Sequence, residues 1–191
     1  MQKKDYFEYA KKVFGEDIIC KSDVDTNTDS ICEMLSIYGE RALCDCIVGG
    51  EINKRKFSFS YLIKVYKSER RKKISDWGFT GCMLKIEDRE IKETAFGYCG
   101  KIFKRMISSD MVKNFKIRDF SVYSLCDQLS VETEKRMRRY REWIEDELCY
   151  HFSCSYAISM KPGSVEIVFK DPDLNSVEHE LKFIKEILCI T

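Results

Sequence analysis

The chain has 191 residues, of which 44% are hydrophobic and 13% aromatic, a composition that supports a sizeable core and excludes disorder throughout. Its 33 basic side chains are balanced by 32 acidic ones, so the whole molecule has no field that would draw it to nucleic acid or to a membrane. We find no apolar run long enough to span a bilayer and no signal peptide, and therefore expect a cytoplasmic protein without membrane contact.

The ten cysteines stand mostly in apolar, periodic segments, which predicts reduced core residues rather than a disulfide framework. Cys149, His151 and Cys154 are close enough in sequence to share a metal, but no second pair follows at a spacing typical of zinc sites. The chain also lacks a Gly-rich phosphate loop, a nucleophile motif and a zinc-protease motif. We expect no metal, no cofactor and no enzymatic activity.

In chain order, the first predicted element is a helix over residues 3–14, where apolar side chains recur at helical spacing and Gly15 follows at a cap position. Residues 21–30 are rich in turn and capping residues and predict a loop. An apolar stripe then predicts a second helix over residues 31–47, which a glycine pair ends.

The segment from residue 57 to residue 66 fits two structures. Its aromatic and branched side chains alternate as in a strand, whereas Phe57, Tyr61 and Val65 also lie on one face of a helix. Periodicity alone slightly favours the strand.

Several motifs in this half of the chain occur in a known order. A Phe14-Gly15 pair is followed by a loop, by the run from Leu35 to Ala42 around Tyr38-Gly39-Glu40, by a glycine-containing turn and by Tyr61 to Val65. Over about residues 3–74 this order resembles the helical domain shared by DnaD and DnaB-type primosome proteins of Gram-positive bacteria and their phages. The resemblance implies that residues 57–73 are helical and take part in DNA binding and helicase loading.

The second half of the chain predicts a different module. An amphipathic helix is expected over residues 89–107. Helix, turn, helix and hairpin then follow in the order of a winged helix, and a last helix closes the chain. The first helix covers residues 122–129, the turn covers residues 130–133, and the next helix runs from the turn to residue 148. The hairpin strands are expected at residues 155–160 and 165–169, and the last helix at residues 174–190. The predicted fold is therefore mainly α with a small β-hairpin, divided into a DnaD-like helical domain at residues 1–75 and a winged-helix-like domain at residues 76–191.

Two basic stretches are candidate DNA contacts. The first could neutralise phosphates while an aromatic ring stacks on an unpaired base; it comprises Lys64, Lys67, Arg70, Arg71, Lys72 and Lys73 with Tyr61. The second stands where a recognition helix would meet the major groove; it comprises Lys135, Arg136, Arg138 and Arg139. Each stretch also fits a solvated face, and the second fits a helix with salt bridges four residues apart.

The leading functional hypothesis is a non-enzymatic protein that binds single- or double-stranded DNA, acting in replication in the manner of a primosome or helicase loader, or as a regulator. The alternative is a protein-binding adaptor or inhibitory subunit of a phage or bacterial defence complex with no DNA contact. The near-zero net charge favours this alternative. Both hypotheses allow a protein partner or self-association.

Overall fold

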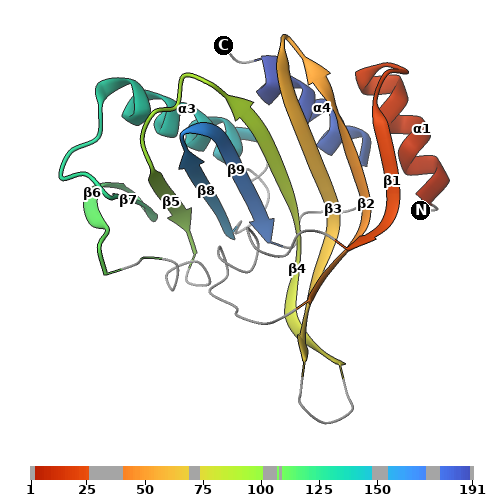
Figure 1. Ribbon diagram of the computed structural model, residues 1–191, viewed down its shortest axis with the longest axis horizontal. Helices are drawn as coiled ribbons and strands as arrows, with labels where there is room; N and C mark the ends of the chain where they lie inside the picture. Colours follow the sequence, from red (N-terminus) through yellow and green to blue (C-terminus); the bar gives the residue numbers. More distant parts are fainter. Residues whose placement is uncertain are drawn as a thin grey trace.

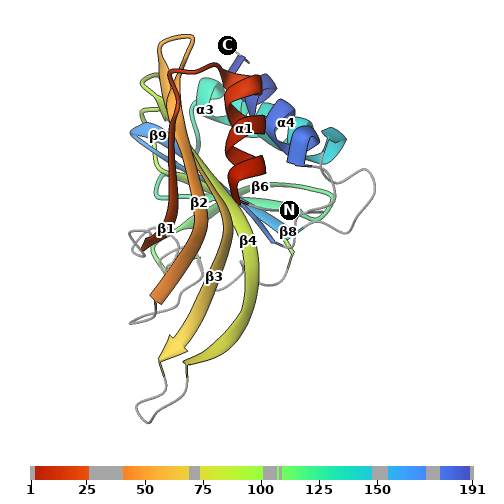
Figure 2. The same cartoon turned by 90° about the vertical axis from the view of Figure 1, so that its right-hand side faces the viewer.

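The computed structural model describes residues 3–25, 41–68, 74–100, 107, 109–147, 155–170 and 177–189. In these ranges nine strands form a single antiparallel sheet, and three helices lie together on one side of it (Figures 1 and 2). More of the described residues lie in strands than in helices. The prediction of a mainly α protein is therefore wrong.

The first half of the chain contributes one helix and four neighbouring strands. The order is α1 (Lys3–Phe14), β1 (Ile19–Asp25), β2 (Arg41–Ile52), β3 (Arg55–Ser68) and β4 (Ile74–Asp88). β1 pairs with β2, β2 with β3 and β3 with β4, and Figure 1 shows the far ends of β3 and β4 projecting beyond the rest of the sheet. The helix predicted at the N-terminus is confirmed by α1, but the loop predicted over residues 21–30 is in part strand β1.

No DnaD-like helical domain is present in the described residues between 3 and 74, so that assignment is wrong. Of the predicted second helix, residues 31–40 lie outside the described part and the remainder belongs to β2. Residues 57–66 lie within β3, as their alternation favoured. Aromatic and β-branched side chains at every second position suit a half-buried pleated surface better than a helix, and the resemblance outweighed this signal.

The second half adds five strands and two helices. They are β5 (Ala95–Cys99), β6 (Val112–Ile117), β7 (Phe120–Ser124), α3 (Val131–Glu147), β8 (Ser155–Lys161), β9 (Gly163–Lys170) and α4 (Val177–Cys189). The hairpin β8–β9 is inserted between β4 and β5, giving the sheet order β1-β2-β3-β4-β9-β8-β5-β7-β6. The boundary expected between residues 75 and 76 falls inside β4, which pairs with β9 along eight positions from Gly81 to Asp88.

The predicted winged helix is wrong, although three of its parts are correct. The longer helix after the predicted turn, the hairpin around Pro162 and the last helix are confirmed by α3, β8–β9 and α4, although α3 begins at Val131, inside the predicted turn. The helix predicted at residues 122–129 is replaced by β7 and a bend, and the helix predicted from residue 89 is replaced by a turn and β5. A wing flanks its helices, whereas this hairpin is a central part of the sheet.

The main core lies between the sheet and the helices. Tyr6 of α1 stacks on Tyr61 of β3 with ring centroids 4.5 Å apart, and apolar residues of α3 and α4 complete the layer over β4, β8 and β9; the buried ones include Met137, Ile144, Leu181 and Ile184. Gly97 of β5 is required here, because a Cβ at this position would lie 2.9 Å from Met137 Sδ and overlap the ring of Phe120. The absence of a side chain at residue 97 lets α3 approach the sheet.

Candidate functional site

Of the first predicted DNA-contacting stretch, the structure describes only one side chain, that of Tyr61. Tyr61 is 6% exposed and belongs to the core under α1, so its ring is not available to stack on a base. Lys64 and Lys67 lie on the projecting part of β3. The four other members of this stretch, Arg70, Arg71, Lys72 and Lys73, fall outside the described residues.

The second stretch lies on α3, and its residues point in different directions. Lys135 and Arg139 are exposed. The guanidinium of Arg138 donates from Nε to Glu134 Oε1 at 2.8 Å and lies 4.4 Å above the centre of the Phe115 ring on β6. Arg138 therefore attaches the helix to the sheet edge. Its pair with Glu134 is a salt bridge between residues four apart, as the alternative interpretation of this helix expected.

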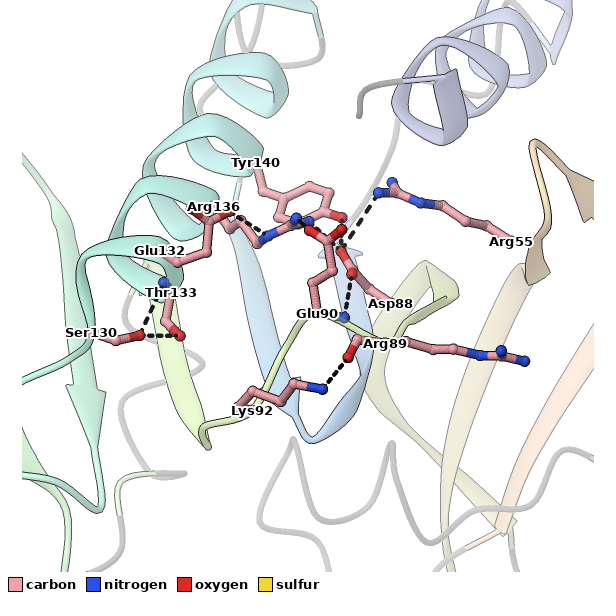
Figure 3. A network of polar contacts seen from close by, with 10 residues as sticks. All are labelled: Arg55, Asp88, Arg89, Glu90, Lys92, Ser130, Glu132, Thr133, Arg136 and Tyr140. Carbon is pink, nitrogen blue, oxygen red and sulfur yellow. Dashed lines mark hydrogen bonds and ion pairs between the residues drawn. The ribbon is translucent and has the colours of Figure 1, made fainter.

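Arg136 turns toward the sheet, where it meets the buried end of β4 (Figure 3). Its Nη1 donates to Asp88 Oδ2 at 2.7 Å and its Nε donates to Glu132 Oε1 at 3.0 Å, and a third contact reaches Glu90. The Arg136 side chain is 12% exposed and that of Asp88 is 2% exposed. Arg136 is thus enclosed by acidic partners and cannot reach a groove of DNA.

The same carboxylate joins two further elements. Arg55, at the start of β3, has a guanidinium nitrogen 4.0 Å from Asp88 Oδ2, and the Tyr140 hydroxyl of α3 donates to that oxygen over 3.5 Å. The backbone amide of Glu90 donates to Asp88 Oδ1 at 3.2 Å. Burial is the largest cause that raises the pKa of Tyr140 to about 12. Since Asp88 is surrounded by donors from its own protein, we assign this cluster a structural role.

The other side of the sheet carries the candidate functional site. We call it the helix-free face, because none of the described helices lies on it (Figure 2). Side chains alternate along a strand. In each strand, the residues next to those that pack under the helices therefore point to the helix-free face. One row across neighbouring strands runs Ile19, Gly49, Ser58, Lys85, Glu166.

The next row shows the apolar character of the helix-free face. It runs Lys21, Ile47, Ser60, Met83, Val168, Ala157, Tyr98 across seven strands. The buried apolar members of this row belong to a second apolar cluster, separate from the core under the helices; the full cluster is Cys44, Ile63, Met83, Phe96, Tyr98, Ala157 and Val168. Although the described helices all lie on one side of the sheet, buried apolar residues are thus present on both faces.

A groove of about 610 Å³ opens at the β1 end of the helix-free face. Apolar and small residues line it together with charged ones; they are Ile19, Ile47, Gly49, Gly50, Phe57 and Ser58 with Asp17, Lys21, Glu51 and Lys56. Gly49 makes the groove deep in the middle of its row, because no side chain stands there between Ile19 and Ser58. Ile47 lines the groove and also packs against the second cluster, so the two are continuous.

Aromatic rings occupy the opposite end of the helix-free face. Tyr98 stacks against Phe96 at 5.9 Å and against Tyr123 at 6.1 Å between ring centroids. Burial, followed by the neighbouring Tyr123, raises the pKa of the Tyr98 hydroxyl. Such rings offer flat apolar surfaces with polar hydroxyl groups at their edges.

A charged pair stands between the groove and the rings. Lys85 Nζ donates to Glu166 Oε1 at 2.8 Å, and the Glu166 side chain is 5% exposed whereas that of Lys85 is 49% exposed. The pair therefore places one accessible ammonium group in the middle of a largely apolar face.

The described residues contain neither a candidate metal site nor a helix that could span a membrane. They contain no group of three or more His, Cys, Asp or Glu side chains that could hold a metal ion; Cys149, His151 and Cys154 lie outside this part of the chain. No helix within the same ranges is both long and apolar enough to cross a membrane.

The sequence matches no protein-family model and no curated protein. The arrangement of one broad antiparallel sheet with its helices is shared with a solved structure. That structure is the crystal structure of the mycobacterial trehalose monomycolate transport factor A, TtfA, with a TM-score of 0.54 and 10% sequence identity over 98% of this chain and 92% of the other. At this identity the likeness is one of fold.

The prediction of a DNA-binding replication protein is wrong. It depended on a DnaD-like domain and a winged helix, and the described residues instead form a single antiparallel sheet with the fold of the solved structure. That structure gives the alternative of a defence adaptor no support either. The groove residues were missed because Gly49 and Gly50 were interpreted as the end of a helix; the alternation after Phe57 was the signal that could have placed them in a sheet.

Proposed function

We propose that this protein is a non-enzymatic accessory factor that binds an amphiphilic molecule, with a hydrocarbon chain and a polar head, on the helix-free face. The observation that carries the proposal is the groove at the β1 end, which is open to solvent and continuous through Ile47 with a buried apolar cluster. Its volume is within the range of small-molecule sites, roughly 300–1,000 Å³.

The chemistry of the lining suits the two parts of such a molecule. Ile19 and Ile47 can cover a hydrocarbon chain, and each buried methylene contributes about 0.8 kcal/mol. Charged side chains at the same groove, such as Lys21 and Lys56, can donate hydrogen bonds to the oxygens of a polar head. A purely polar ligand would leave the apolar lining in water, so we infer that the chain provides most of the binding free energy.

The likeness to TtfA supports a transport role for the bound molecule. The solved protein is a transport factor for trehalose monomycolate, and the two folds correspond over 92% of its chain. We propose that the ligand of the present protein belongs to the same broad chemical class, an acylated sugar or a similar lipid.

Direct binding tests the proposal. The whole chain would be titrated with a long-chain trehalose monoester below its micelle concentration, with free trehalose and the fatty acid alone as comparisons, by isothermal calorimetry. We expect the monoester to bind most tightly and trehalose not to bind. Absence of monoester binding, or equal binding of trehalose, would overturn the proposal.

A matched pair of variants locates the binding. Ser58 lies half-buried in the groove, so Ser58→Leu should fill it and weaken monoester binding by about ten-fold or more. Ser109 lies in an exposed turn before β6, and Ser109→Leu makes the same chemical change away from the groove. Equal affinities of the two variants would exclude the groove as the binding site.

A further inference from the structure

The two edges of the sheet differ in regularity. Among the described strands, β1 pairs only with β2 and β6 pairs only with β7. The β6 ladder shifts register between Lys113 and Phe115, and such a bulge makes an edge a poor template for another strand. The β1 ladder keeps one register from Ile19 opposite Gly49 to Asp25 opposite Leu43. Because its ladder is regular, β1 is the edge better suited to accept a further strand.

We propose that β1 is a self-association surface, on which a second copy of this chain adds its own β1 in antiparallel orientation. A two-fold axis perpendicular to the sheet at Ser22 would relate the two copies and join the two sheets into one. The inference stands on the edge strand and its sequence and does not depend on the proposed ligand.

Charge selects this register. With the axis at Ser22, Lys21 of each copy lies opposite Asp23 of the other, and the symmetry makes this favourable pair twice. Moving the axis to residue 21 would place Lys21 against Lys21, and moving it to residue 23 would place Asp23 against Asp23. Directly opposed like charges are destabilising in a sheet, so both neighbouring registers are disfavoured.

The same reasoning excludes the other edge. β6 contains Lys113 and Lys116, both exposed, and no acidic residue. Antiparallel pairing of β6 with its own copy would therefore form no pair of opposite charges, unlike the pairing proposed for β1. The two edges thus differ in charge pattern as well as in regularity.

The dimer would also bring two grooves together. A two-fold axis perpendicular to the sheet keeps both helix-free faces on the same side. Ile19 and Lys21 line the groove and belong to β1, so the grooves of the two copies would adjoin at the interface. The side chain of Ile19, which is 61% exposed in the single chain, would then lie beside the added strand.

Charge reversal tests the proposal in the full chain by sedimentation equilibrium over a concentration series. Lys21→Glu alone and Asp23→Lys alone each turn two attractive pairs into two repulsive ones, and each should weaken dimerisation by roughly ten-fold or more. The double variant Lys21→Glu with Asp23→Lys exchanges the charges and should restore dimerisation to within about three-fold of the original. Lys113→Glu makes a comparable reversal on β6 and should leave dimerisation unchanged.

Recovery in the double variant separates a lost interface from a damaged fold. A chain that stays monomeric at all concentrations would overturn the proposal, as would a dimer that is insensitive to both single reversals. Dimerisation weakened by Lys113→Glu would place the interface at β6 instead. A double variant that is folded by circular dichroism but remains monomeric would also contradict the register.

Discussion

Asp88 at the end of β4 and Arg136 on α3 are 48 residues apart in sequence and joined by a hydrogen bond of 2.7 Å. The side chain of Asp88 is almost fully buried, so this contact is made where water cannot replace it. It fixes the position of α3 over the sheet.

Arg136→Met should destabilise the fold by about 3 kcal/mol, because it leaves the buried carboxylate of Asp88 without its closest cation. Lys135→Met is the control, since the neighbouring Lys135 is exposed and its loss should change stability by less than about 0.5 kcal/mol. Urea unfolding followed by circular dichroism measures both values. Equal values for the two variants would show that the cluster does not hold the helix.

Gly97→Ala should displace α3 from the sheet. The added methyl group would lie 2.9 Å from Met137 Sδ and overlap Phe120, and overpacking of this kind costs roughly 1–3 kcal/mol. Gly163→Ala provides a comparison with a different cause: its φ is +80° and the space around it is open, so about 1 kcal/mol of backbone strain is expected. Near-ultraviolet circular dichroism should change in the first variant only.

Cys44 should resist alkylation in the native protein. Burial raises the pKa of its thiol to about 11, so at pH 8 it stays protonated, and the thiolate is the reactive form. Cys126 is exposed and should react under the same conditions. Peptide mapping after iodoacetamide treatment compares the two sites. Labelling of Cys44 as fast as of Cys126 without unfolding would contradict its burial.

Stability should fall in alkaline solution partly through Tyr140. Its pKa is raised to about 12 in the folded protein, whereas an unfolded tyrosine loses its proton near pH 10. The unfolded state therefore gives up this proton first, and its contribution to stability is complete below about pH 10 and lost between pH 10 and 12. Tyr140→Phe should have a flatter dependence of unfolding free energy on pH in this window. Parallel curves for the two proteins would disprove the assignment.

Local sequence signals predicted several elements correctly but did not predict how these elements are arranged in the fold. The helices at residues 3–14 and 131–147 have clear apolar periodicity, and the Pro162-Gly163 turn between β-prone runs marks a hairpin. These signals depend on neighbours within a few residues. The insertion of the hairpin between β4 and β5 depends on contacts across the whole chain, which no local pattern contains.

The errors occurred where one apolar pattern fits two structures. In β2, Cys44, Cys46 and Val48 are all buried, yet Ala42 and Ile47 nearby are also apolar and a helical stripe can be drawn through them. The groove could not be predicted from the sequence either, because it is formed by residues of three strands that become adjacent only when the sheet forms. For Arg136, the sequence showed the positive charge but not that the side chain would pair with the buried Asp88.

The place of the β8–β9 hairpin has a consequence for how the chain folds as it is synthesised. Until residues 155–170 leave the ribosome, β4 lacks its partner β9 and β5 lacks its partner β8. The two parts of the sheet are then separate, and each has an unpaired strand edge. Pairings between distant residues make folding slow and leave strand edges exposed to aggregation in the meantime. We therefore expect the nascent chain to need protection until the hairpin closes the sheet.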